Sequence, residues 1–115
     1  MNSSKIEDLF AQTLSCDYDA DAPWMAVTAL RNIGNREVFD RAVAWCGSQN
    51  PPERARGADV LAQLGKTAEN PNNVFPQESF LVISKMVSSD SEPLPLSSAI
   101  YALVWSATQI LIYPF

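Results

Sequence analysis

The hydrophobic positions of this chain recur at the spacing of α-helices. Apolar side chains three and four residues apart lie on one face of a helix, which can then pack against a neighbour. No segment alternates apolar and polar residues over the length of a half-buried strand. The pattern therefore predicts an all-α domain of about six helices. The segments with this spacing are residues 5–14, 22–33, 36–47, 53–64, 77–88 and 96–107.

Residues that begin or end helices separate these segments. Pro23 suits a first helical turn, where its missing N–H group has no partner to lose. Gly34 and Gly65 each follow a helical segment and are expected to end it in a left-handed conformation. The Asn- and Pro-rich residues 66–76 predict an inserted loop.

The apolar stripe of each segment predicts which side chains form the core. A stripe is buried only where another helix covers it. The predicted core positions are Ile6, Leu9, Phe10, Leu14, Val38, Phe39, Ala42, Val43, Cys46, Phe80, Leu81, Ile83, Met86, Val87, Ala99, Ile100 and Leu103.

The second, fourth and sixth segments are copies of one pattern. DADAPWMAVTALRNIG, residues 19–34, aligns with NPPERARGADVLAQLG, residues 50–65, at a constant offset of 31 residues. EPLPLSSAIYALVWSA, residues 92–107, follows at a further offset of 42, and the inserted loop accounts for the difference. Each copy follows a more apolar helix, so the repeating unit is a helical hairpin, and stacked hairpins bury a continuous core. The predicted repeats cover residues about 5–34, 36–65 and 77–107.

Small residues on the second helices predict close approach of neighbouring backbones. Gly57 lies inside a helical segment, where glycine costs about 1 kcal/mol relative to alanine. A tight helix crossing is the expected compensation. The small residues at these positions are Ala26, Ala29, Gly57, Ala58, Ala99 and Ala102.

The middle copy resembles the second helix of a HEAT repeat, of the short bacterial type also found in bilin-lyase-like proteins. It has Asn50 and Pro51 at the place of the usual Asp-Pro, while the first copy has Pro23 in place of the repeat arginine. The third copy has lost both the arginine and the final glycine. The resemblance implies one domain over residues 1–115, a right-handed α–α superhelix of about three hairpins. The matching residues are Arg54, Ala58, Leu61, Leu64 and Gly65.

The same resemblance implies structural roles for several polar residues. In that family the repeat arginine and the acid before the second helix commonly bond across neighbouring repeats. Arg54 is therefore expected to pair with Asp19, with Asp21 or with a backbone carbonyl. Arg56 lies two residues further on, on another helix face, and is expected in solvent.

Charge and composition argue against several function classes. The 115 residues carry 13 acidic and 8 basic side chains, a formal net charge of −5. Nucleic-acid affinity depends on neutralising phosphates with Lys and Arg, so this balance disfavours nucleic acids and anionic membranes. The chain has no histidine, the commonest general base and metal ligand. No nucleophile has an evident base partner, so no enzyme, cofactor or catalytic residue is predicted.

Two smaller sequence features point to structure more than to chemistry. CDYDAD places Asp17, Asp19 and Asp21 in the spacing of a calcium loop, without the glycine and glutamate that such a loop needs. A capping role at the following helix is the stronger interpretation. Cys16 and Cys46 are expected as small buried residues in a reducing compartment, which favours the cytoplasm.

The resemblance implies that the second helices line a concave surface for a protein partner. Tyr101 and Trp105 lie one helical turn apart and share a face, and both residue types are common interface anchors. The alternative is that they pack against the tail or a further repeat. The candidate partner-binding residues, all directed away from the predicted core, are Met25, Thr28, Asp59, Gln63, Tyr101 and Trp105.

The tail, TQILIYPF at residues 108–115, resembles the start of a further first helix. Natural solenoids end with a polar cap, and this end is apolar. The chain is then a fragment of a longer solenoid, or the tail folds back, or two copies pair as a homodimer. The predicted function is a non-enzymatic protein-interaction module. The alternatives are a nucleic-acid or DNA-repair-type binding protein, which the acidic charge disfavours, and, more remotely, a bilin-lyase-like or chaperone protein.

Overall fold

The structure, a computed structural model, describes residues 3–65 and 73–112, with side chains for 4–65 and 73–106. Within these residues the chain forms six α-helices and no strand, which confirms the all-α prediction. Residues 66–72 of the predicted loop lie outside the described part. The helices are α1 (Ser3–Gln12), α2 (Asp21–Ile33), α3 (Arg36–Cys46), α4 (Pro51–Ala62), α5 (Pro76–Ser89) and α6 (Pro93–Ile112).

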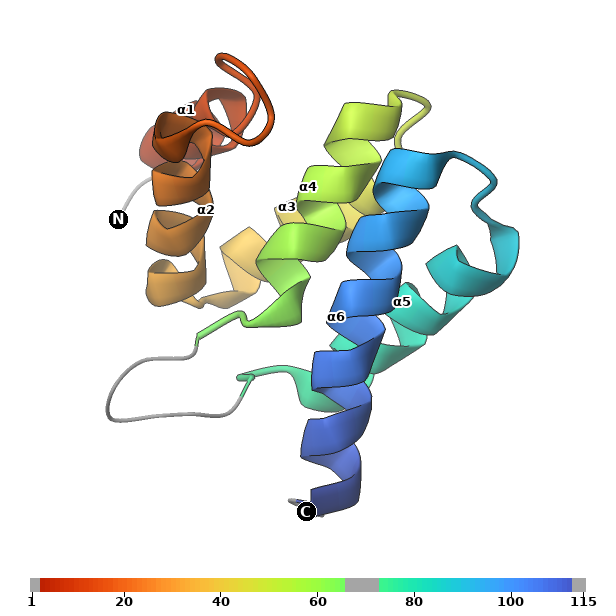
Figure 1. The fold of residues 1–115 in the computed structure, drawn as a ribbon. Coiled ribbons are helices and arrows are strands. Elements are labelled where there is room, and N and C mark those ends of the chain that lie inside the picture. The colour runs from red at the N-terminus through yellow and green to blue at the C-terminus, as the bar shows by residue number, and fades with distance from the viewer. Residues whose placement is uncertain (1–2, 66–72, 113–115) are drawn as a thin grey trace.

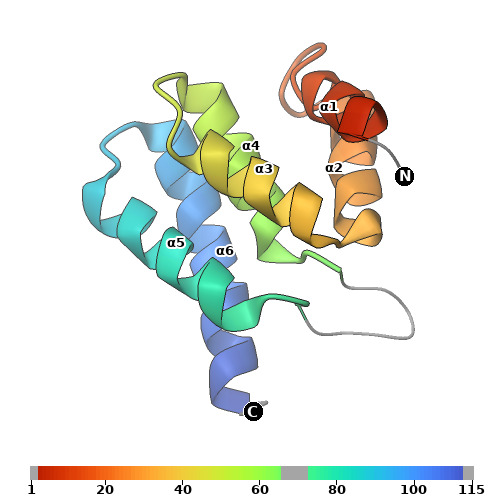
Figure 2. The ribbon, with the colours of Figure 1, turned by 180° about the vertical axis from the view of Figure 1, so that it is seen from behind.

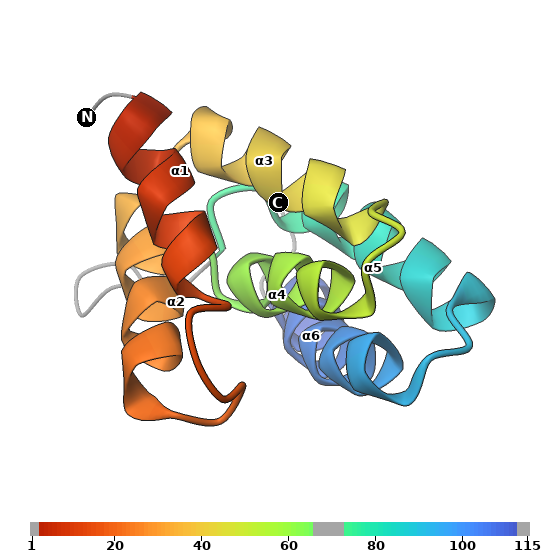
Figure 3. The same cartoon turned by 90° about the horizontal axis from the view of Figure 1, so that it is seen from above.

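The helices lie in two layers. Each consecutive pair packs together, and α4 also contacts α2 and α6 in its own layer (Figure 1). Seen from behind, α3 and α5 lie side by side (Figure 2). The view from above shows α1, α3 and α5 along one side and α2, α4 and α6 along the other (Figure 3). The Cα radius of gyration is 13.0 Å, the value expected of a compact domain of this length.

The ends of the helices follow the local sequence signals. The side chain of Asn35 accepts a hydrogen bond from the backbone N–H of Val38 at 2.9 Å, and so caps α3. Asn50 caps α4 in the same way through the N–H of Glu53 at 3.3 Å. Gly34 ends α2 with φ at 54°, in the left-handed region that favours glycine.

The two glycines that end second helices lie against each other. A Cβ atom on Gly34 would lie 2.6 Å from the Cα of Gly65, and the N–H of Gly65 donates to the carbonyl of Arg31 at 2.7 Å. Gly65 also has a positive φ, of 79°. The end of α4 is thereby bonded directly to the end of α2.

Helix α4 lies at the centre of the fold. Every residue from Ala55 to Ala62 is buried, because α2, α3 and α6 cover different sides of the helix. The close approach expected at Gly57 lies against α3: a Cβ there would sit 2.7 Å from the carbonyl oxygen of Ala42 and 2.9 Å from the backbone nitrogen of Cys46. The tight crossing is therefore within one hairpin, α3 with α4, and not between two second helices.

The structure corrects four of the sequence-based placements. Leu81 and Ile100 are 68% and 47% exposed, because α5 and α6 are the last hairpin and no further helix covers their outer sides. Cys16 is exposed, and only Cys46 is buried. The tail is wrong as a separate helix, since α6 continues without a break to Ile112; residues 113–115 lie outside the described part.

Candidate functional site

A fully buried arginine lies at the centre of the molecule. Arg56, on α4, is 0% exposed. Its Nε donates to the carbonyl of Thr13 at 2.9 Å, and its Nη2 to the carbonyl of Tyr18 at 2.5 Å. Nη1 donates to Oδ2 of Asp59 at 3.1 Å, so a carboxylate one helical turn away balances the buried charge. The expectation that Arg56 lies in solvent is wrong, because the α1–α2 connection covers this face of α4.

Two aromatic rings enclose the same guanidinium. The Arg56 Cζ atom lies 3.5 Å from the centroid of the Tyr18 ring and 4.6 Å from that of Trp24. The two rings meet edge to face, with their centroids 6.1 Å apart. A desolvated cation over an aromatic face gains about 2 kcal/mol. Arg56 therefore fixes the α1–α2 connection and the start of α2 onto α4.

Asp59 is the second buried charge of α4. It is 4% exposed, so its placement among outward, partner-facing residues is wrong. The hydroxyl of Tyr18 donates to its Oδ2, and Ser98 Oγ of α6 lies 3.1 Å from the same hydroxyl. Its main-chain carbonyl accepts from Arg31 of α2, through Nε at 3.0 Å and Nη2 at 2.6 Å. Side chains from α2, α6 and the α1–α2 connection thus meet at one turn of α4.

This network shifts the protonation equilibria of its members. Burial, followed by the charge of Asp59, raises the pKa of the Tyr18 hydroxyl, which keeps it protonated as a donor. Burial also lowers the pKa of Arg31, against the opposing effect of Asp59. The phenol and the guanidinium are therefore held in place as hydrogen-bond donors to Asp59.

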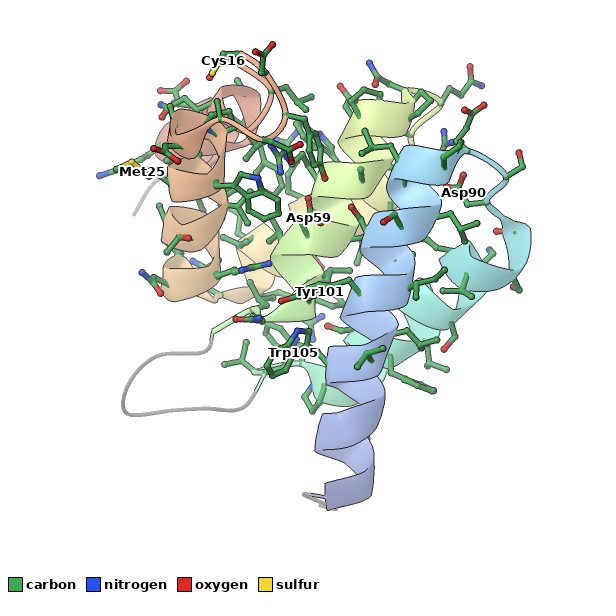
Figure 4. The ribbon with its side chains drawn as sticks, viewed as in Figure 1. Cys16, Met25, Asp59, Asp90, Tyr101 and Trp105 are labelled. Carbon is green, nitrogen blue, oxygen red and sulfur yellow. The ribbon has the colours of Figure 1, made fainter. Side chains whose placement is uncertain are left out.

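A hollow of about 350 Å³ opens over the network, and we call it the Asp59 pocket. Its walls come from the α1–α2 connection, α2, α4 and α6. Figure 4 shows Asp59 and Tyr101 in the space between α2 and α6. The lining residues are Tyr18, Asp19, Trp24, Asp59, Leu94, Ser97, Ser98 and Tyr101.

Helix α6 carries most of the exposed large hydrophobic side chains of the described residues. Its sequence has no charged residue from Pro93 to Ile112. The rings of Tyr101 and Trp105 lie edge to face with their centroids 6.3 Å apart, and both project from α6 on the side of α2 (Figure 4). We call these five residues the α6 stripe: Leu94, Ile100, Tyr101, Val104 and Trp105, which are 37–61% exposed.

The remaining predicted partner-binding residues do not join this site. Met25 is 70% exposed and points away from α4 (Figure 4). Met25 and Thr28 line a separate open hollow of about 500 Å³, formed by α2 alone. Gln63 is half-buried at the end of α4. Of the six candidates, Asp59 and Tyr101 line the same pocket, and Trp105 lies one turn further along α6.

Arg54 connects neighbouring hairpins, but not the pair that the resemblance implied. Its Nε and Nη2 donate to the two carboxylate oxygens of Asp90, at 2.7 and 3.1 Å, and Nη1 donates to the carbonyl of Ser48 at 3.0 Å. Pairing with Asp19 or Asp21 is therefore wrong. The start of α4 lies beside the α5–α6 connection, so the contact joins the second hairpin to the third. This hydrogen bond lowers the pKa of Asp90.

The acidic residues before α2 do not cap it with their side chains. The N-cap residue is Ala20, without a side-chain hydrogen bond. Asp21 lies in the first turn, where a negative charge interacts favourably with the helix dipole. Asp19 is exposed at the edge of the Asp59 pocket. The capping expectation is wrong for both residues.

Comparison of the chain with protein-family models, with curated proteins and with solved structures finds no match. Among the described residues, no helix is both long and apolar enough to cross a bilayer. Within the same residues, no three acidic or cysteine side chains come together in a way that could hold a metal ion.

The central network was missed at the sequence level, although one signal for it exists. Arg56 and Asp59 are three residues apart on a helix and can pair. They lie among Gly57, Ala58 and Val60, in a stretch too small and apolar for a solvated helix face. Opposite charges at this spacing, inside a run of small residues, indicate a buried ion pair.

Proposed function

We propose that the protein is a HEAT-like interaction module without chemistry of its own. In this proposal it binds a partner protein through the α6 stripe and the neighbouring Asp59 pocket. The single observation that carries it is the gathering of exposed hydrophobic side chains on one uncharged helix. Soluble proteins rarely leave contiguous apolar patches exposed unless a partner covers them.

Several features of the fold support the repeat architecture within this proposal. First and second helices fall into separate layers (Figure 3). Gly34 and Gly65 occupy the same place in two successive hairpins, and both have positive φ values. Arg54 bonds one hairpin to the next through Asp90. A right-handed superhelix of three hairpins is the arrangement that we propose from these contacts.

The nature of the exposed side chains supports binding to a protein. Tyr101 and Trp105 are about half and about two-fifths exposed, at 51% and 38%. Aromatic side chains of this kind supply much of the binding energy at protein interfaces, because they bury a large area and lose few rotamers. Ile100 and Val104 extend the apolar surface along the same helix.

The polar groups of the core support a module without catalysis. The donors of Arg56 are bonded to two carbonyls and to Asp59, so they are occupied within the fold. Burial raises the pKa of the Cys46 thiol to about 12, which keeps it protonated at neutral pH. Both cysteines are free thiols, which supports our proposal of a reducing, cytoplasmic location.

The test is recovery of a partner by the tagged full chain from extracts of its source organism. The double variant Tyr101→Ala, Trp105→Ala is expected to lose the partner while it keeps the helical circular dichroism of the wild type. Leu81→Ala is the matched control, since Leu81 is 68% exposed on α5, outside the stripe. Equal recovery by the wild type and the double variant would contradict the proposal.

A further inference from the structure

The Asp59 pocket has three aromatic walls. Tyr18, Trp24 and Tyr101 line it from the α1–α2 connection, α2 and α6. The faces of such rings carry partial negative charge and attract cations. The hydroxyls of Ser97 and Ser98 add acceptor oxygens to the same lining. A volume of about 350 Å³ is small for a ligand site, but it accommodates one long side chain.

One oxygen of the Asp59 carboxylate has no donor among the described residues. The bonds from Tyr18 and from Arg56 both reach Oδ2, and none reaches Oδ1. Asp59 is 4% exposed, and what remains accessible of it opens into the pocket. A carboxylate oxygen this deeply buried is costly without a hydrogen bond. A donor that reaches Oδ1 must therefore enter through the pocket.

The charges around the pocket favour a cationic donor. Arg56 balances Asp59 from beneath, and the donors of Arg31 that reach Asp59 are bonded to its carbonyl. No lysine or arginine lines the pocket. Asp19 lies at its edge, with exposed Asp17 and Asp21 two residues away on either side. The entrance is therefore negative, in a chain whose net charge is −5.

We propose that the Asp59 pocket receives a lysine or arginine side chain of the partner protein. The ammonium or guanidinium group donates to Asp59 Oδ1, between the rings of Trp24 and Tyr101. Arg56 already places a guanidinium on the inner side of the Tyr18 and Trp24 rings, which shows that these rings accept this group. This inference deepens the proposed function. Tyr101 belongs both to the pocket and to the α6 stripe, so the partner segment is basic next to an apolar stretch.

The experiment is a titration of the ¹⁵N-labelled full chain with small probes, followed by heteronuclear NMR. The cationic probes are N-acetyl-arginine amide and N-acetyl-lysine amide. The neutral control is N-acetyl-citrulline amide, which has nearly the shape of the arginine probe without its charge. We expect both cationic probes to shift the Trp24 indole N–H and the amides of Ser97, Ser98 and Tyr101. Citrulline should bind at least tenfold more weakly.

Surface variants make the test independent of folding. Asp19→Asn and Tyr101→Ala alter exposed pocket residues, and each is expected to weaken the arginine probe at least threefold. Glu37→Gln makes the same charge change as Asp19→Asn on exposed α3, and should leave the affinity unchanged. Equal affinity for arginine and citrulline, or shifts outside the pocket only, would overturn the inference. So would wild-type affinity in both pocket variants.

The two proposals fail in different experiments. The small probes need no partner, so their binding tests the pocket even if the α6 stripe binds nothing. Loss of partner recovery in the Tyr101→Ala, Trp105→Ala variant, together with absent probe binding in the wild type, would retain the proposed function and reject the cation pocket. Probe binding with unchanged partner recovery would give the opposite conclusion.

Discussion

Arg56 shows how one buried charge organises several segments. A solvated arginine contributes little to folding, and surface ion pairs are worth about 0–1 kcal/mol. Here the guanidinium binds Thr13 and Tyr18 by their carbonyls, and Asp59 by its carboxylate. Removal of one partner of a buried pair leaves the other uncompensated and costs about 3–5 kcal/mol.

The first prediction concerns this pair. Arg56→Ala should lower the free energy of unfolding by about 3–5 kcal/mol, because Asp59 then stays buried without its cation. The measurement is urea unfolding followed by circular dichroism. The double variant Arg56→Ala, Asp59→Ala should be less destabilised than the sum of the two single variants. Additive effects would show that the two side chains do not interact. Arg41→Ala, at an exposed ion pair with Glu7, is the control with little expected effect.

At the scale of helices, α4 is the element that determines the packing of the others. Its small residues let α3 approach until the backbone of Ala42 lies at Gly57. The crossing leaves no room for even a methyl group, although alanine is the better helix former by about 1 kcal/mol. Packing therefore overrides helix propensity at this position.

The second prediction compares two glycines of the same hairpin. Gly57→Ala should destabilise the fold by about 1–3 kcal/mol, because the new Cβ would lie 2.7 Å from the Ala42 carbonyl oxygen. Gly47→Ala is the matched control, since its Cβ would meet nothing nearer than 3.7 Å and the backbone φ is −98°. Thermal unfolding of both variants gives the comparison. A stabilised Gly57→Ala variant would mean that α3 and α4 lie further apart.

The helices were predictable from the sequence because each one has its own periodic stripe and its own end signals. Gly34, Asn50 and Pro51 act through local backbone geometry, which a sequence contains in full. The site was less accessible. The burial of Asp59 depends on a connection and a helix 41 and 39 residues away, at Tyr18 and Ser98, and no local pattern encodes that contact.

The partner of Arg54 illustrates the same limit. An arginine at the start of the second helix was expected to bond across hairpins, and it does so. Which hairpin it reaches depends on where the α5–α6 connection passes, since Asp90 lies 36 residues away. A repeat pattern predicts that units stack, but the degenerate outer copies here do not specify which loops meet.

At the scale of the whole molecule, the three hairpins expose different surfaces. The first hairpin supplies charged and aromatic groups to the Asp59 pocket, and the last supplies the uncharged α6 stripe. The final turns of α6 project beyond the other helices (Figure 1). A helix surface without charges can also pair with its own copy, as isologous dimers do.

The third prediction therefore concerns the mass in solution. A second copy seated on the α6 stripe would give a dimer at micromolar concentration, measured by light scattering after gel filtration. The Tyr101→Ala, Trp105→Ala variant would then be a monomer, and Leu81→Ala would remain dimeric. A monomeric mass for the wild type would contradict self-association and leave the stripe to a different protein.

The contrast between the two cysteines has a practical consequence. The thiolate is the form that reacts with alkylating reagents, and the Cys46 thiol stays protonated and buried. Cys16 is exposed in the α1–α2 connection, two residues before Tyr18, whose carbonyl Arg56 holds. A maleimide dye should therefore label one position of the unmodified chain. That position is anchored beside the Asp59 pocket, so the natural sequence already contains an attachment point for a fluorescent reporter of its occupancy.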